Sequence, residues 1–253
     1  DTLAGIFAAG MKPSGNKDPF ALRRAALGLA RTLIEGGLAL DLRAQFDEAL
    51  AQLPEAALVA GVPKGKDGRA PAFDPAGRRS AIAAELYDFV LDRLRGYYVD
   101  RGTPAEAFEA VRALAPGDLA DFDQRLRAVV AFASLPEARA LAAANKRIGN
   151  LLRQAAGPGA RAIDAALLEV AAERTLHDAH AAALADVAPL AQRRDYVGVL
   201  KRLAKLREPI DRYFDEVMVM VDDERVRANR LALLGAVADS FLRVADIALL
   251  PAA

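Results

Sequence analysis

The strongest chemical signal in the sequence is a run of positive charge with no acidic residue in it. Residues 138–163 carry Arg139, Lys146, Arg147, Arg153 and Arg161. A helix turns by about 100° per residue, so Lys146, Asn150 and Arg153 would share one face of a helix here. The opposite face would carry Leu141, Ile148, Leu151 and Leu152. The spacing predicts a helix that buries one side and offers cations and an amide on the other, as a surface that follows phosphates would.

A second cluster of positive charge follows in the same half of the chain. It consists of Arg193, Arg194, Lys201, Arg202, Lys205 and Arg207, with only Asp195 among them. The acidic residues Asp211, Asp215, Glu216, Asp222, Asp223 and Glu224 then reverse the sign. Charged helices usually just face water, and this interpretation stays open beside phosphate binding.

The sequence offers little for metal or nucleotide chemistry. There is no cysteine, which excludes thiolate metal sites and a cysteine nucleophile, and the two histidines are His177 and His180. Spaced i and i+3 around Asp178, they could share a metal, but without a third ligand we expect solvent-facing or capping histidines. Residues 222–224 lack EF-hand spacing and are expected to cap the last helix. No phosphate-binding glycine motif occurs.

The elements that must position these residues are helices. The chain has 253 residues, 34 basic and 34 acidic, and 53% are apolar, with alanine and leucine prominent. Apolar residues recur at three- and four-residue spacing, which predicts an all-α fold. The expected helices cover residues 19–35, 41–53, 80 onward, 104 onward, 118 onward, 136–156, 163–185 and 223–249. Residues 61–79, rich in proline and glycine, predict a mobile surface loop.

Local signals predict where these helices begin and end. Asp18 and Pro19 should start a helix that Gly36 and Gly37 stop, and Thr103 with Glu106 should form a capping box. Pro189 and Pro209 should break the chain. Residues 217–221, Val-Met-Val-Met-Val, fit either a short strand or the buried end of a helix, and the alanine-rich surroundings favour the helix.

Two further expectations concern the setting of the chain. The start lacks methionine and lies in an apolar segment, so we expect a segment of a longer polypeptide. No apolar run reaches the roughly 20 residues that cross a bilayer, so we expect no membrane partner. The absence of cysteine suits the reducing cytoplasm.

Several strings resemble the carboxy-terminal part of the β subunit of bacterial glycyl-tRNA synthetases of the two-subunit, α2β2 type. They are DTLAGIF at 1–7, KDPFALRRAA at 17–26, ANKRI at 144–148, VMVMVDD at 217–223 and LRVADI at 242–247. The strings occur in the order that this family shows, and the similarity extends over the whole chain.

The resemblance implies that the α and β subunits have different roles. In that family the α subunit carries the site that joins glycine, ATP and tRNA, so ATP and Mg belong to the α subunit and this chain needs no cofactor. The resemblance implies that residues 1–135 are the rear of a helical domain related to HD phosphohydrolases, plus connecting helices. Residues 136–253 would then be an anticodon-binding helical bundle similar to that of arginyl-tRNA synthetase. The implied partners are glycine tRNA and the α subunit, with no role for DNA.

Anticodon recognition then implies roles for particular residues. Unpaired bases are recognised by stacking, by hydrogen bonds to base edges and by cations on phosphates. Lys146, Arg147 and Arg153 are the expected phosphate contacts, and Asn145 and Asn150 are amides able to pair with base edges. Tyr213 and Phe214 could stack on bases, although their helical spacing favours core packing.

Arg230 needs a partner, because it falls on the apolar face of the last helix, where an unpaired guanidinium is costly. A buried pair with a carboxylate such as Asp222 or Asp246 is one hypothesis, and phosphate binding at the domain edge is the other.

Two further function classes stay open. A metal-dependent phosphohydrolase of the HD type would need a histidine, a His-Asp pair and a later aspartate, and no complete site can be built from this sequence. A helical scaffold that binds only a partner subunit is the third interpretation.

Overall fold

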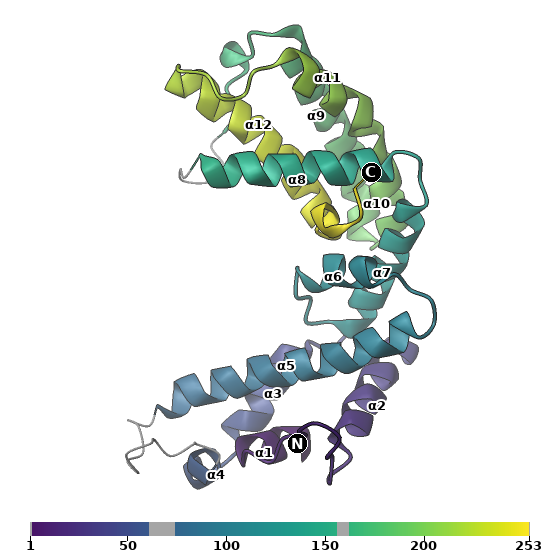
Figure 1. The fold of residues 1–253 in the computed structure, drawn as a ribbon, viewed down its shortest axis with the longest axis vertical. Helices are drawn as coiled ribbons and strands as arrows, with labels where there is room; N and C mark the ends of the chain where they lie inside the picture. Colours follow the sequence, from purple (N-terminus) through teal and green to yellow (C-terminus); the bar gives the residue numbers. More distant parts are fainter. Residues whose placement is uncertain (1, 61–73, 156–161, 253) are drawn as a thin grey trace. The chain divides into compact units, whose positions relative to one another are not determined.

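The structure is a computed structural model that describes residues 2–60, 74–155 and 162–252. Within these residues the chain is helical and has no strand, only isolated bridges between Ser14 and Lys17 and between Asp41 and Asp118 (Figure 1). The prediction of an all-α fold is confirmed. None of the described helices is both long and apolar enough to span a bilayer.

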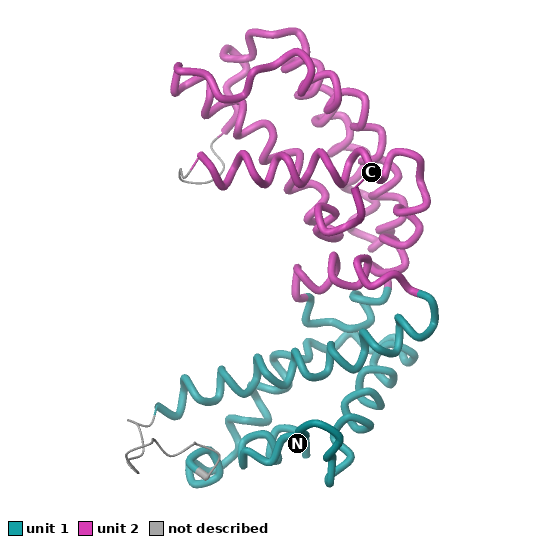
Figure 2. Tube along the Cα trace, viewed as in Figure 1, with its two compact units in different colours: residues 1–102, 116–123 teal, residues 103–115, 124–253 magenta. Residues whose placement is uncertain are grey.

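Two compact units divide the chain (Figure 2). The first contains residues 1–102 and 116–123, and the second contains residues 103–115 and 124–253. The expected domains, 1–135 and 136–253, stay a prediction, since compactness and evolutionary domains are separate criteria.

The first unit is built around one long helix. Its helices are α1 (Thr2–Ala8), α2 (Leu22–Glu35), α3 (Leu42–Ala51), α4 (Glu55–Ala60) and α5 (Pro75–Val99). Helix α5 packs against each of the other four and buries Leu86, Tyr87 and Val90. The Tyr87 hydroxyl donates to the Pro116 carbonyl at 2.8 Å, so the one polar atom of this buried ring is satisfied.

The second unit is a helical bundle. Its helices are α6 (Ala105–Arg112), α8 (Ala138–Gln154), α9 (Ala171–Gln192), α10 (Tyr196–Leu203), α11 (Arg207–Glu216) and α12 (Glu224–Leu242), with α7 (Leu119–Ala133) divided between the units. Short 3-10 helices are η1 (Ala165–Leu167), η2 (Ala204–Leu206) and η3 (Ile247–Leu249). Helix α8 packs against α12, α11 and η3, and α9 packs against α10, α11 and α12. Ile148, Leu176, Ile210, Leu233 and Phe241 form its buried core.

Two predicted helix starts carry the expected aspartate, but only Asp223 is the N-cap of its helix. The Asp18 carboxylate accepts from the backbone N–H groups of Leu22 and Arg23, although the helix itself begins at Leu22. Asp223 accepts from Arg225 and Val226 at the start of α12, and these hydrogen bonds lower the pKa of its carboxyl. Capping rules therefore identified the start of α12 correctly, whereas α2 starts later than predicted, since its N-cap is Ala21 and Pro19 lies outside the helix.

Other local predictions were wrong. Helix α5 begins at Pro75 rather than Ser80, because Asp74 caps it. Thr103 and Glu106 form no capping box, since α6 starts after Pro104 without a side-chain cap. Helix α9 continues through Pro189 to Gln192. Residues 217–221 are neither strand nor helix. The expected loop at 61–79 lies largely outside the described residues.

Candidate nucleic-acid interface

The exposed face of α8 carries the predicted cations. Arg139, Lys146, Arg147, Asn150 and Arg153 are all exposed, and we call this set the α8 crest. Leu141 and Ile148 are buried on the opposite side. Leu151 and Leu152 depart from the prediction, because Leu151 is half-buried and Leu152 is 37% exposed. Leu152 lies over Gly235 of α12, and because this glycine has no side chain, α12 does not cover Leu152 there.

The cations of the α8 crest are exposed, and two of them, Lys146 and Arg153, line a hollow that Asp239 and Asp246 also line. Within the described part of the chain, none of the four has a carboxylate oxygen within ion-pair distance. The guanidinium of Arg147 lies 4.1 Å from the centre of the Phe214 ring, and Arg153 donates to the Asn150 side-chain oxygen. Exposed cations along one helix, without an ion pair to a described residue, are what a phosphate backbone would bind.

The second cluster of positive charge differs in this respect. Arg193 lies 3.9 Å from Asp195, Arg202 lies 3.7 Å from Asp186, and Arg207 lies 3.3 Å from Asp211. These exposed pairs contribute little to stability, but they place a negative charge beside each arginine. The α8 crest is therefore the better candidate for an anion of the two. Arg161 falls outside the described residues.

Asn145 does not share the exposed face. It is buried, and its amide nitrogen donates to the Leu141 carbonyl of its own helix at 2.9 Å. One residue back from Lys146 is a rotation of about 100°, which takes Asn145 toward the core. The expectation that Asn145 pairs with a base edge is therefore corrected.

Arg230 is buried in an ion pair, as the structural hypothesis predicted, but with other partners. Its Nε donates to Glu173 at 2.6 Å, its Nη1 donates to the Met218 carbonyl at 3.0 Å, and Nη2 lies 3.6 Å from Glu169. Asp246 instead caps η3. The placement of Arg230 among phosphate contacts is corrected as well, because its side chain is only 6% exposed.

The two aromatic residues of α11, Tyr213 and Phe214, differ in how deeply they are buried. Tyr213 is fully buried, and burial raises the pKa of its hydroxyl, with the nearby Glu173 charge acting in the same direction. Phe214 is half-buried and packs edge-on against Tyr213, with 5.9 Å between ring centres. Core packing is thus confirmed for Tyr213, whereas Phe214 reaches the surface beneath Arg147.

The histidines do not form a metal site with each other. His180 is buried, with Nε2 2.7 Å from the Ser240 hydroxyl, and His177 lies 3.1 Å from Asp178. Among the described residues, no three side chains form a group that could hold a metal ion. The expectation of a solvent-facing or capping residue is therefore wrong for His180, which is a buried, hydrogen-bonded group.

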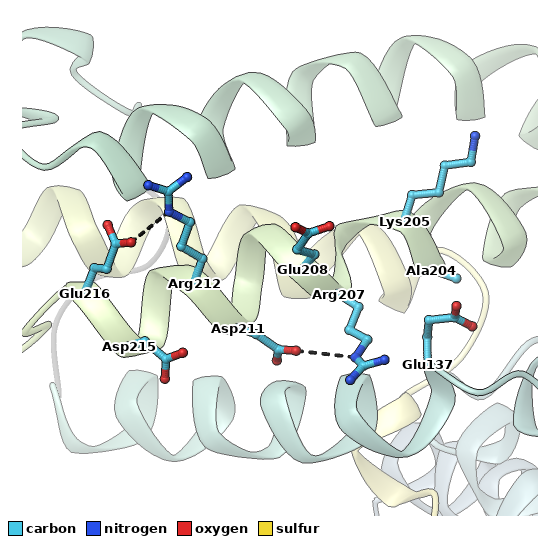
Figure 3. Close-up of a pocket in the computed structure, with 9 residues that line it drawn as sticks. All are labelled: Glu137, Ala204, Lys205, Arg207, Glu208, Asp211, Arg212, Asp215 and Glu216. Atoms are coloured by element: carbon cyan, nitrogen blue, oxygen red, sulfur yellow. Dashed lines mark hydrogen bonds and ion pairs between the residues drawn. The ribbon is translucent and has the colours of Figure 1, made fainter.

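A hollow of about 680 Å³ lies where η2 and α11 meet the residue that precedes α8 (Figure 3). Its lining has five carboxylates, Glu137, Glu208, Asp211, Asp215 and Glu216, against the three cations Lys205, Arg207 and Arg212. Figure 3 shows Arg207 paired with Asp211 and Arg212 paired with Glu216. The surplus of negative charge makes this hollow a poor site for a phosphate.

Comparison with known proteins shows which protein family the chain belongs to. The family described as glycyl-tRNA synthetase beta subunit matches residues 1–113, and the DALR anticodon binding domain matches residues 141–247. The chain belongs to the glycyl-tRNA synthetase beta subunit family. Nearly all of the α8 crest lies within the DALR match.

Curated relatives agree with this assignment. The chain is 52% identical over 249 residues to the glycine–tRNA ligase beta subunit of Xanthomonas campestris pv. campestris (strain B100), covering 98% of this chain and 33% of the relative. It is 50% identical over 250 residues to that of Pseudomonas aeruginosa (strain LESB58), covering 99% and 34%. The chain therefore spans about a third of these relatives. The matches do not favour the phosphohydrolase alternative.

The exposed methionines in residues 217–221 form a surface that the sequence did not predict. Met218 is 74% exposed and Met220 is 44% exposed, next to Phe214 and Arg147. The alternation of valine and methionine in residues 217–221 was visible in the sequence. The alternation fits either a strand or the end of a helix, so it does not by itself indicate that both methionines face outward.

Proposed function

We propose that this chain is the tRNA-recognition part of a glycine–tRNA ligase beta subunit and that the α8 crest binds the RNA. The observation that supports this most strongly is the set of four exposed cations on one helix, none in an ion pair with a described residue, largely inside the DALR match. Phosphates along an RNA strand need such cations, and a helix holds them at fixed spacing.

The residues of the α8 crest would contact different parts of the RNA. Lys146, Arg147 and Arg153 would contact phosphates of an unpaired loop, and the Asn150 amide would be close enough to reach a base edge. Arg153 donates to Asn150, which orients the amide along the crest. Recognition would thus combine charge, which gives affinity, with an amide, which gives selectivity.

The remainder of the enzyme would supply the chemistry. The α subunit would use ATP and Mg to activate glycine in an α2β2 assembly in the cytoplasm, while this chain would hold the tRNA and need no cofactor of its own. Neither a membrane nor DNA is a proposed partner.

Binding of glycine tRNA, compared with the same tRNA carrying an altered anticodon, tests the proposal. We expect the wild-type chain to prefer the natural anticodon and to bind more weakly as salt rises. Lys146→Ala with Arg147→Ala should weaken binding and lower the slope of log affinity against log salt by roughly two, one for each lost phosphate contact.

Lys17→Ala is the matched control, because Lys17 is also exposed but lies far from α8 in the sequence and in the other compact unit. It should leave both the affinity and the salt slope unchanged. An RNA interaction that is absent, or that does not depend on salt, would contradict the proposal and favour a scaffold that binds only the partner subunit.

A further inference from the structure

Residues 217–221 present two methionines to solvent in a regular way. Val217 and Val219 are each 6% exposed, whereas Met218 is 74% and Met220 is 44% exposed. A methionine left in water gives up the hydrophobic free energy that burial would provide. Two such side chains on neighbouring outward positions mark a surface that a partner could cover.

The segment is held in this position by two arginines of α12. Arg230 donates to the Met218 carbonyl at 3.0 Å, and Arg227 donates to the Val221 carbonyl at 2.7 Å. Arg230 is itself fixed by Glu173, whose side chain has no exposure. A buried ion pair therefore anchors the backbone of Met218, so the outward methionine is part of a fixed arrangement.

The methionines border a hollow that also contains a cation and an aromatic ring. It measures about 530 Å³ and includes Arg147, Leu151 and Phe214 with Met218 and Met220. The flat guanidinium of Arg147 lies 4.1 Å from the Phe214 ring centre. Guanidinium planes, aromatic rings and polarisable sulfur are the groups on which a flat, electron-rich ring packs well.

Charge around the hollow distinguishes a base from a phosphate. Asp215 and Glu216 also line it, and they would repel a phosphate placed inside. Arg147 belongs both to this hollow and to the α8 crest, whose other cations form no ion pair with a carboxylate in the described ranges. A strand whose phosphates follow the crest would thus bring a base, rather than a phosphate, to the methionines.

We propose that the hollow formed by Arg147, Phe214, Met218 and Met220 is a stacking site for one unpaired nucleobase of the bound RNA. The proposal rests on the proposed function and adds a subsite to it. The phosphates of the neighbouring nucleotides lie on the α8 crest, and the base packs between the guanidinium and the methionine side chains.

Fluorescence of 2-aminopurine, placed at each position of the anticodon loop in turn, tests this site. We expect one position to be quenched when the wild-type chain binds, because stacking quenches this base. Met218→Ala with Met220→Ala should abolish that quenching and weaken binding roughly tenfold, the loss typical of one stacked base. The salt slope should not change, since no phosphate contact is removed.

Three further measurements distinguish this stacking site from the proposed function. Removing the quenched base from the RNA should make the wild type and the double variant bind equally. Leu38→Ala, at an apolar residue that is 44% exposed in the other unit, is the matched control and should change nothing. The thermal unfolding of the double variant should match that of the wild type, because the removed side chains are exposed.

The results that would overturn the stacking site differ from those that would overturn the proposed function. If the wild type binds RNA with a salt slope set by the α8 crest but no loop position is quenched, the stacking site is wrong and the proposed function stands. If the double variant binds RNA normally but loses association with the α subunit, the hollow is a protein interface. If the wild type binds no RNA, both proposals fail.

Discussion

At the scale of single residues, the pair of Arg230 and Glu173 is the most consequential contact in the second unit. Both side chains are almost fully removed from water, and the two residues lie 57 positions apart in the sequence. The second Glu173 oxygen also accepts from the Val170 backbone at 2.7 Å. One carboxylate therefore joins the start of α9, the middle of α12 and, through Arg230, residue 218.

Glu173→Gln should destabilise the chain strongly. The substitution leaves Arg230 buried with only the more distant Glu169 to balance it, and breaking such a pair costs about 3 kcal/mol in the free energy of unfolding. Urea unfolding followed by circular dichroism measures this loss. Glu224→Gln, which removes an exposed partner of Arg227, is the control and should have no measurable effect. Equal stability of both variants would contradict the role assigned to Glu173.

His180 should make stability depend on pH. Burial, the largest cause, lowers its pKa below the ordinary 6.5, and the charges of His177 and Arg243 act in the same direction. As pH falls below 6.5, the unfolded chain takes up a proton that the folded chain resists, so the free energy of unfolding decreases. His180→Gln removes this titration, and its melting temperature should fall less than that of the wild type between about pH 7 and pH 5.5.

His177→Gln provides the comparison, since His177 is a third exposed and its charge is a smaller cause of the lowered pKa of His180 than burial is. This variant should retain most of the wild-type dependence on pH. If His180→Gln and the wild type lose stability in parallel, then His180 is not a group that resists protonation in the fold.

At the scale of elements, α9 shows tertiary packing overriding a local rule. Pro189 lacks the N–H that would bond to the Ala185 carbonyl, and its ring crowds that carbonyl. The helix nevertheless continues to Gln192. Val187, two residues before the proline, is buried. Burial of the α9 face against α10, α11 and α12 outweighs the local cost.

Pro189→Ala should stabilise the chain. Pro189 is exposed, so alanine removes no packing and restores one helical hydrogen bond, for a gain of about 1–3 kcal/mol in the free energy of unfolding. Pro209→Ala is the matched control, because Pro209 lies in the first turn of α11, where a missing N–H costs little. Urea unfolding of the two variants should separate them; a Pro189→Ala variant no more stable than the wild type would contradict this account.

At the scale of the whole molecule, the chain spans about a third of its curated relatives, and its sequence lacks the glycine motifs that bind nucleotide phosphates. We expect the chain, incubated with glycine, ATP and tRNA, to form no glycyl-tRNA while still binding the tRNA. Acid-precipitable radioactive glycine measures the first and a filter-binding assay the second. Robust charging by the isolated chain would refute the division of labour between subunits.

The helical class, several helix starts and the charged face of α8 follow from the sequence alone. These features depend on residues within one or two turns of each other, where periodicity and capping act. Asp223 and the Lys146 face were identified in this way. The match to a family of glycyl-tRNA synthetase subunits follows from local strings too, because order along the chain is enough to recognise them.

Which side chains are available for binding depends on how the helices pack together. This packing buried Asn145 beside an exposed Lys146, paired Arg230 with Glu173 instead of Asp222 or Asp246, and turned Met218 outward next to Arg147. Each outcome depends on which helix packs opposite, and that partner lies tens of residues away. Burial and ion pairing are set by such distant neighbours, so no pattern confined to a single helix could have revealed them.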